Sequence, residues 1–559
     1  MRRTPLALVP LALVLLLVLA AGRSAGVAQV ETPVASPPAT PLATPQASPQ
    51  ADLAGVAALP LTDARRAAFE AYVADAMNRL GVPGASVAVV QGGEVVYLQG
   101  VGVKEVGGTQ RVTPDTLMMI GSVTKSMTST MAATLVDEGW LSWDTPVADL
   151  LPAFAFPDPA LTERLTVADA FCACTGLPRR DPEIFFNWDA LTPERLIASV
   201  AEFPVTAPFG ERFQYNNQLY AVGGYAATVA AGGAPNDLFA AYRLAMRDRF
   251  LGPLGMERST FALEQVLTSG DYAVPHGADL EGQTRPFPLL ADDRFVGSVA
   301  PAGALWSSAR DMARYVQMEL ADGIAPDGTR VVSAENLDRT RAPRTAIPAP
   351  PGLPPLLYEG TQAYGLGWGV GAYKGQPLVS HSGGTLGFVS EVAFLPEADL
   401  GVVILTNGGA GAGPFTLGVQ NRLFELLFDQ PAEFDPLLGQ LLEAGAAQAA
   451  QLRPVDPAAV APYLGQYANP ALGEVELRLE WERLVFDAGE IRSEVRGQAD
   501  AAGQVSAYVL ADPPLSGGPI ALRQDADGRP EIAVVIEGEG AETYVFALLE
   551  ADIGATPAA

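Results

Sequence analysis

One short stretch of the chain reads Gly121-Ser122-Val123-Thr124-Lys125-Ser126, and a helix is expected to start within it. Apolar residues follow at helical spacing and Gly139 provides a stop, so the pattern predicts a helix over residues 122–138. Side chains three positions apart lie on the same face of a helix. Ser122 and Lys125 are therefore expected to project together from its first turn.

Lys125 is one of only three lysines in a chain with 35 basic residues, the others being arginines. The positive end of a helix dipole stabilises an alkoxide and disfavours an ammonium ion, so a lysine placed there accepts a serine proton more readily. The stretch predicts a buried, neutral Lys125 that acts as a base for Ser122. The alternative is a serine N-cap followed by an exposed lysine.

Regular segments flank this helix on both sides. A helix is expected over 62–80, followed by strands over 85–91 and 94–100 that flank a two-glycine turn. Later in the chain, three strands are expected over 377–382, 388–395 and 401–406 and a helix over 415–428. If early and late strands share one sheet, the residues between them form a largely helical insert. The sequence therefore predicts an α/β (α+β) fold, an antiparallel sheet flanked by helices.

Two further motifs follow the Ser-x-x-Lys stretch. Tyr215-Asn216-Asn217 lies in a loop-like stretch, and His381-Ser382-Gly383-Gly384 ends one of the late strands. The three motifs, in this order, resemble those of the penicillin-recognising serine hydrolases, the superfamily of class C β-lactamases, DD-carboxypeptidases and related esterases. The resemblance covers roughly residues 62–430 and implies a β-lactamase-like form of the fold.

The resemblance implies that Ser122 attacks a carbonyl and forms an acyl-enzyme. Lys125 and Tyr215 would share the proton transfers, and the positive charges of Lys125 and His381 would favour a Tyr215 phenolate. Asn217 would hydrogen-bond Lys125 or a substrate amide.

The implied oxyanion site lies between two backbone N–H groups, those of Ser122 and Gly384. Ser382, Gly383 and Gly384 would form the strand edge that binds substrate, because glycine lets another backbone approach closely. No cofactor and no metal are expected. Only two histidines occur, His276 and His381, so metal ligands are scarce.

Departures from the family pattern bear on the substrate. His381 stands where typical β-lactamases carry lysine, which favours DD-peptidases, esterases and D-amino-acid-processing relatives over β-lactamases. Asn216 stands where serine is usual, and Ala173-Cys174-Thr175-Gly176 replaces the common His-Thr-Ser-Gly. Neither change removes a catalytic group.

Cys172 and Cys174 are the only cysteines, so no disulfide framework is expected. Two cysteines this close in sequence rarely bridge without strain, and buried, small apolar side chains are expected in preference to a redox or metal site. His276 lies beside proline and glycine and is expected to be a loop residue bonded to backbone rather than a catalyst.

The N-terminus has the layout of a secretory signal peptide over residues 1–28, with a basic start, an apolar run and small residues. We expect export, cleavage and no stable membrane insertion afterwards; the alternative is an uncleaved membrane anchor. Residues 29–60 are rich in Pro, Thr and Ala and are expected to form a disordered linker.

The remaining length favours at least two domains. We expect a β-lactamase-like hydrolase domain over 61–430, a linker over 431–457, and an up-and-down antiparallel barrel or sandwich over 458–550. The last region resembles the lipocalin-like domain appended to many such hydrolases, which implies the barrel. Barrel strands are expected over 474–479, 483–487, 506–510, 532–536 and 543–548. Residues 551–559 are expected to form a disordered tail.

The formal net charge of −28 argues against nucleic acid as a partner. The leading hypothesis is an exported, extracytoplasmic serine hydrolase acting on an ester, amide or D-amino-acid peptide bond, with a small-molecule or short-peptide substrate of cell-wall or other origin. The alternative is a catalytically silent module that binds peptidoglycan or a partner. The joint presence of Ser122, Lys125, Tyr215 and His381 favours the enzyme, because a silent pocket needs no proton relay.

Overall fold

A computed structural model describes residues 52–348, 362–489, 491–499, 504–536 and 542–549 of the chain. The expected signal peptide, residues 29–51 of the expected N-terminal linker and the expected C-terminal tail lie outside these residues. Residues 52–60, also expected to be disordered, instead pack on the fold, where Leu53 is buried and its N–H donates to the Lys374 carbonyl oxygen at 2.7 Å. Within the described residues, no helix is both long and apolar enough to cross a membrane.

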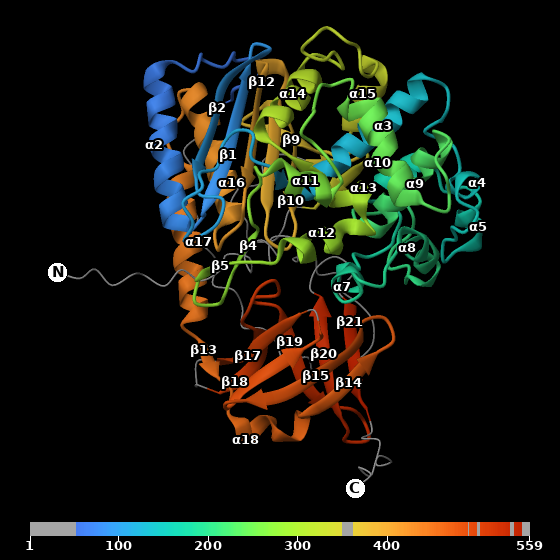
Figure 1. The fold of residues 1–559 in the computed structure, drawn as a ribbon, viewed down its shortest axis with the longest axis vertical. Helices are drawn as coiled ribbons and strands as arrows, with labels where there is room; N and C mark the ends of the chain where they lie inside the picture. Colours follow the sequence, from blue (N-terminus) through green and yellow to red (C-terminus); the bar gives the residue numbers. More distant parts are fainter. Residues whose placement is uncertain (1–51, 349–361, 490, 500–503, 537–541, 550–559) are drawn as a thin grey trace, which may run out of the picture.

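Early and late strands form one sheet, as the sequence predicts. β1 pairs antiparallel with β12, and the eight strands run in the order β2-β1-β12-β11-β10-β9-β8-β7. Their bounds are Gly84–Gln91 (β1), Glu94–Gly102 (β2), Thr345–Ile347 (β7), Gln362–Tyr364 (β8), Gly369–Tyr373 (β9), Gln376–Gly384 (β10), Val389–Leu395 (β11) and Leu400–Thr406 (β12). The expected mixed fold with an antiparallel sheet is confirmed (Figure 1).

Helices cover both faces of this sheet. The helices α2 (Asp63–Leu80) and α16 (Ala412–Leu427) pack together on one face, and α14 (Ala309–Leu320) packs against β1 and β12 on the other (Figure 1). Every residue of the central strand β12 is buried, because both faces are covered.

The chain between the early and late strands is largely helical, as expected. Its other helices are α3 (Thr124–Asp137), α4 (Val147–Leu150), α5 (Pro159–Thr162), α6 (Val167–Phe171), α7 (Asp181–Phe185), α8 (Pro193–Ser199), α9 (Asn217–Ala230), α10 (Leu238–Met246), α11 (Leu263–Ser269), α12 (Leu289–Gly297), α13 (Ala300–Gly303) and α15 (Ala334–Arg341). Two small two-stranded sheets complete the insert, β3 (Met118–Met119) with β6 (Trp306–Ser307) and β4 (His276–Ala278) with β5 (Thr284–Pro286).

The ends of α2 show why the local sequence predicts it well. The Thr62 side chain accepts a hydrogen bond from the backbone of Arg65 at the start, and Gly81 ends the helix with a φ of 66°, in the left-handed region. Such caps depend only on neighbouring residues, so they are legible in the sequence.

The C-terminal region is a closed up-and-down barrel, which confirms the expected topology. Consecutive strands pair from β14 to β21, and β14 pairs with β21 to close the ring. The strands are β14 (Gly465–Asn469), β15 (Gly473–Glu480), β16 (Arg483–Asp487), β17 (Arg492–Ala499), β18 (Val505–Leu510), β19 (Pro519–Gln524), β20 (Pro530–Ile536) and β21 (Glu542–Leu548). β14, β17 and β19 are additional to the five expected strands.

The stretch 431–457, expected to be a linker, contains regular structure. The helix α17 (Phe434–Ala449) begins by burying Phe434 and Leu438 in the core between the sheet and α16, and it runs toward the barrel (Figure 1). The strand β13 (Leu452–Pro454) then pairs with β17. Apolar burial against the sheet and α16 therefore orders a connection that composition alone suggested was loose.

Candidate active site

Ser122 lies in a single 3-10 turn, Gly121–Val123, just before α3 begins at Thr124. Gly121 has a φ of 51°, and a Cβ there would lie 2.5 Å from the backbone nitrogen of Gly384. Only glycine fits both the left-handed backbone and this approach. The turn thus brings Ser122 beside the end of β10, and the serine precedes the α-helix instead of opening it.

Lys125 is buried, with 1% of its surface exposed, which confirms that expectation. Its Nζ lies 2.7 Å from Asn217 Oδ1, 2.7 Å from the Ala302 carbonyl oxygen and 3.1 Å from Ser122 Oγ. Burial holds the pKa of Lys125 well below its ordinary value, and the charge of Arg179 adds to this while Asp181 opposes it. A neutral amine has two N–H groups, which the two oxygens accept, so its lone pair is left for the Ser122 hydroxyl.

Tyr215, Asn216 and Asn217 meet the site at the start of α9. The Asn216 side chain caps the helix by accepting from the Leu219 N–H at 2.7 Å, so asparagine replaces the usual serine without loss of a cap. Asn217 is the first helical residue, and its Nδ2 donates to Asp181 Oδ1 at 2.8 Å. The amide therefore connects Lys125 on one side to a carboxylate on the other.

Burial raises the pKa of Tyr215 above its ordinary value, while polar interaction with Ser122 and the positive charge of Arg179 act in the opposite direction. The Arg179 guanidinium lies 5.3 Å from the centre of the Tyr215 ring, and Lys125 Nζ lies 4.8 Å from it. Tyr215 is therefore a neutral phenol in the resting site.

His381 is also neutral, which differs from the expectation that it supplies positive charge. Burial lowers its pKa to about 3. Its Nδ1 donates to the Ser382 carbonyl oxygen at 2.6 Å, so Nε2 accepts from the Tyr364 hydroxyl at 3.0 Å. With Lys125 and His381 both neutral, the cation beside Tyr215 is Arg179.

The strand end after His381 alternates in burial. Ser382 and Gly384 are exposed, whereas Gly383 is buried. A Cβ on Gly383 would overlap the Ile120 carbonyl oxygen, while a Cβ on Gly384 would meet no atom within 4 Å. Close packing against Ile120 therefore explains why position 383 is a glycine, whereas the space beside Gly384 is open.

A small pocket lies beside the buried Lys125. Its lining includes Lys125, Tyr215, Tyr220, Tyr364, Ala173 and Thr175. All five residues expected to be catalytic thus lie in one neighbourhood, together with Ser382, Gly383 and Gly384.

Three residues of this neighbourhood were missed by sequence reasoning: Arg179, Asp181 and Tyr364. Arg179 Nε donates to Asp181 Oδ2 at 2.5 Å, and Asp181 in turn holds Asn217. The sequence did contain a signal for two of these residues. Arg179 directly follows Thr175-Gly176-Leu177-Pro178, and Tyr364 is the first residue of the stretch 364–368. Each of these two stretches resembles one that is common in the penicillin-recognising serine hydrolases.

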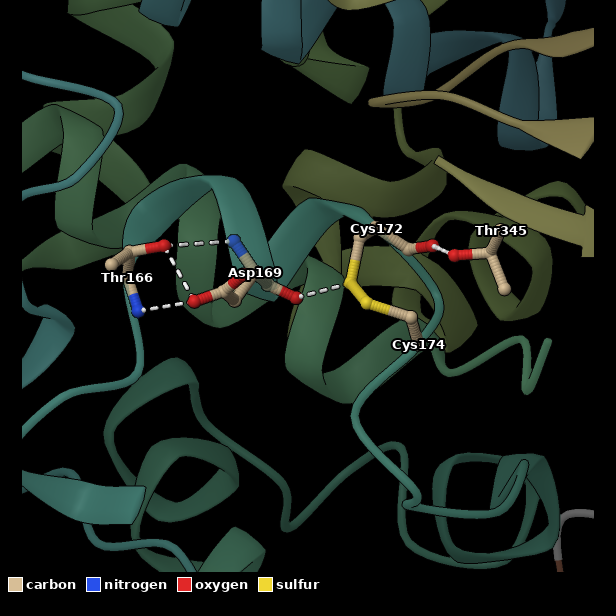
Figure 2. Close-up of a disulfide and its surroundings, with 5 residues drawn as sticks. All are labelled: Thr166, Asp169, Cys172, Cys174 and Thr345. Atoms are coloured by element: carbon tan, nitrogen blue, oxygen red, sulfur yellow. Dashed lines mark hydrogen bonds between the residues drawn. A yellow bond between two sulfur atoms is a disulfide. The ribbon is translucent and has the colours of Figure 1, made fainter. Parts of the chain in front are cut away.

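The two cysteines are joined, so the expectation of two unbridged thiols was wrong. Figure 2 shows the Cys172–Cys174 disulfide at the end of α6, whose start is capped reciprocally by Thr166 and Asp169. Ala173 has a φ of 52° and reverses the chain, which brings the two Cα atoms to 5.2 Å. That separation lies within the range a disulfide spans.

The disulfide loop is tied to the stretch that carries Tyr215. The Ala173 carbonyl accepts from the Gln214 N–H at 2.7 Å, and the Cys174 carbonyl accepts from the Gly210 N–H at 2.7 Å. The Cys172 carbonyl accepts from the Thr345 hydroxyl at 3.2 Å (Figure 2). The bridge therefore supports the wall of the pocket.

His276 is bonded to backbone, as expected, although it lies in the strand β4 and not in a loop. Its Nε2 accepts from the Val106 N–H at 3.0 Å, so its Nδ1 donates to the Asn407 carbonyl oxygen at 3.0 Å. Burial lowers the pKa of His276. Both ring nitrogens are thus occupied by structural contacts.

The chain is similar to several known proteins. Residues 69–424 match the family model described as Beta-lactamase. Penicillin-binding protein 4 of Amycolatopsis lactamdurans is 30% identical over 390 residues, 69% of this chain and 93% of that protein. Unguisins hydrolase ungD' of Aspergillus campestris is 28% identical over 441 residues, 74% of this chain and 78% of that protein.

A solved structure has a similar fold. The octameric penicillin-binding protein homologue from Pyrococcus abyssi superposes with a TM-score of 0.56 at 22% sequence identity, over 87% of this chain and 100% of that chain. The family model covers more than half of the present chain. The chain therefore belongs to the beta-lactamase family of serine hydrolases, the superfamily that its three motifs indicate.

Proposed function

We propose that this protein hydrolyses its substrate through an acyl-enzyme on Ser122. The observation that carries the proposal is the set of three contacts at Lys125 Nζ: two oxygen acceptors use its N–H groups, and Ser122 Oγ lies 3.1 Å away. A buried amine held in this way is a ready base for the hydroxyl.

In acylation, Ser122 Oγ bonds to the substrate carbonyl carbon and its proton passes to Lys125 Nζ. The carbonyl oxygen becomes an oxyanion between the N–H groups of Ser122 and Gly384, two backbones held together at Gly121. The Tyr215 hydroxyl gives its proton to the leaving group as the carbonyl–leaving-group bond breaks, and Lys125 returns a proton to Tyr215.

In deacylation, a water molecule attacks the ester carbon of the acyl-enzyme. Its proton passes to the neutral Lys125, the bond to Ser122 Oγ breaks, and the serine regains a proton from the lysine. The site ends in its starting protonation state. Arg179 steadies negative charge that develops on Tyr215 during the transfers, because its guanidinium lies over that ring.

The substrate we propose is an ester, an amide or a D-amino-acid peptide, small or short, of cell-wall or other origin. The neutral His381 provides no positive charge at the strand end, which disfavours the β-lactamase activity that typical family members with lysine there show. The names of two relatives, Penicillin-binding protein 4 and Unguisins hydrolase ungD', support a hydrolase related to penicillin-binding proteins. Hydrolysis of a nitrophenyl ester, a chromogenic cephalosporin and a D-Ala-D-Ala peptide should be compared directly.

A fluorophosphonate probe tests the acyl-enzyme. We expect wild-type protein to be labelled at Ser122 and the variants Ser122→Ala and Lys125→Arg to remain unlabelled, because arginine keeps the charge but cannot act as a base. Lys104→Arg is the matched control, since Lys104 pairs with Asp271 at 2.9 Å, away from the contacts of Ser122, and should label normally. Labelling of Ser122→Ala, or none of the wild type, would contradict the proposal and favour the silent binding module.

Export is part of the same proposal. The layout of residues 1–28 supports it, and the N-terminal sequence of protein recovered outside the cytoplasm should begin after that segment. Retention of Met1 on that protein would favour the uncleaved anchor.

A further inference from the structure

One segment of the insert, residues 178–188, lies between the candidate active site and the C-terminal barrel; we call it the bridging segment. It contains α7, and Figure 1 shows α7 beside the barrel. On the site side, both oxygens of its Asp181 carboxylate are occupied, one by Asn217 Nδ2 at 2.8 Å and the other by Arg179 Nε at 2.5 Å.

On its other side, the bridging segment enters the barrel core. The ring of Phe186 packs against Phe486 at 6.3 Å and Phe546 at 6.2 Å between ring centres, and both barrel rings are fully buried. Asn187 Nδ2 donates to the Ala471 carbonyl oxygen at 2.9 Å. The Arg180 guanidinium lies 5.4 Å from the centre of the Tyr544 ring.

Asp181 decides which way the Asn217 amide faces. A carboxylate only accepts hydrogen bonds, so Asn217 can donate to Asp181 through Nδ2 but cannot bond to it through Oδ1. With Nδ2 turned to Asp181, Oδ1 faces Lys125 and accepts from it at 2.7 Å. Without the carboxylate, the Asn217 amide could rotate and present its N–H groups to those of Lys125. The lone pair of Lys125 Nζ would then no longer point toward Ser122.

We propose that the C-terminal barrel is a positioning element for the active site: by holding Phe186, it keeps Asp181 on Asn217 and so orients the Lys125 amine toward Ser122. The proposal rests on the hydrolase function proposed above. Asp181 and Phe186 are positioning residues, because neither reaches the reacting atoms. The distances form a continuous path from the interior of the barrel to the base.

The test measures the rate of fluorophosphonate labelling of the full chain against pH, for wild type, Asp181→Asn, Phe186→Ala and Phe186→Leu. Labelling should rise with pH as Lys125 loses its proton. When the Asp181 charge is removed or moved away, the rise in labelling rate should occur at lower pH, because that charge favours protonated Lys125. The rate reached at high pH should fall at least tenfold, since a displacement of about 1 Å in a catalytic group can cost about a hundredfold in rate. Phe186→Leu, which fills most of the space, should fall between wild type and Phe186→Ala.

Trp481→Ala is the matched control, because Trp481 is an aromatic residue of the same barrel with 96% of its surface exposed. It should label as wild type does. The proposal is overturned if the labelling rate of Phe186→Ala rises at the same pH as that of the wild type and reaches the same maximum. If that variant fails to fold, the same result for Phe186→Leu overturns it. Failure of the wild type to label would instead refute the hydrolase function, so the two failures are distinguishable.

Discussion

At the scale of single residues, burial decides the charge state of the site. Lys125 and His381 are both side chains that carry positive charge in water, yet both are held neutral because almost no water reaches them. Arg179 remains the cation because a guanidinium cannot be deprotonated in a protein. Packing therefore makes the Lys125 amine neutral, and its hydrogen bond to the Asn217 amide orients it.

Burial should also make stability depend on pH through Glu391, which is 4% exposed on β11 opposite Ser382. Burial raises its pKa from 4.5 to about 8. Below pH 4.5 the carboxyl is neutral in both folded and unfolded chains, and between pH 4.5 and 8 only the unfolded chain ionises. The free energy of unfolding should thus fall as pH rises through this window, by at most about 5 kcal/mol.

Glu391→Gln cannot ionise and should lose this dependence. Urea unfolding at pH 5, 6.5 and 8 should show the variant gaining on the wild type as pH rises. Glu397→Gln, at an exposed position, serves as the control and should follow the wild type. Parallel pH curves for wild type and Glu391→Gln would contradict the buried, neutral carboxyl.

At the scale of elements, the site forms where the ends of three secondary-structure elements meet: the turn before α3, the start of α9 and the end of β10. A local feature fixes each of these ends. The left-handed backbone of Gly121 forms the turn before α3, the Asn216 side chain caps α9, and Gly383 at the end of β10 packs closely on Ile120. The disulfide loop after α6 adds a fourth support, because its carbonyls accept from the stretch before Tyr215.

Removal of the disulfide should therefore harm activity more than stability. The bridge closes a loop of only three residues, for which the loop-entropy relation gives roughly 1.6 kcal/mol of unfolding free energy. The double variant Cys172→Ser/Cys174→Ser should unfold at slightly lower urea, while its rate of labelling at Ser122 falls severalfold. A reductant should reproduce this in the wild type and change nothing in the double variant; equal labelling rates would show that the bridge does not support Tyr215.

At the scale of the whole molecule, two bodies with separate cores share one chain. The hydrolase domain buries apolar side chains on both faces of its sheet, and the barrel buries its own set around Phe486, Phe546 and Tyr467. Besides α17 and the bridging segment, they touch where the Leu280 N–H donates to the Ala511 carbonyl at 3.0 Å and the Ser516 hydroxyl donates to the Ala278 carbonyl at 2.6 Å.

Separate cores predict two steps of unfolding. Calorimetry should resolve two thermal transitions, because the contacts between the bodies are fewer than those within each. Phe186→Ala should lower the midpoint of the barrel transition, in line with a loss of about 2 kcal/mol from a partly buried ring, and Trp481→Ala should leave it in place. A single transition that both variants leave unchanged would contradict this division.

By itself, the sequence determined what depends on near neighbours: the spacing of Ser122 and Lys125, the caps of α2, the strand periods and the meander of the barrel. Only the tertiary structure decided the rest. The neutrality of His381 depends on the packing around it, and the disulfide depends on the left-handed backbone of Ala173. The hydrogen bond between Asn217 and Asp181 depends on α7, whose segment also contacts a barrel nearly three hundred residues further along the chain. Burial and contact between distant segments set these properties, and neither is written in local spacing.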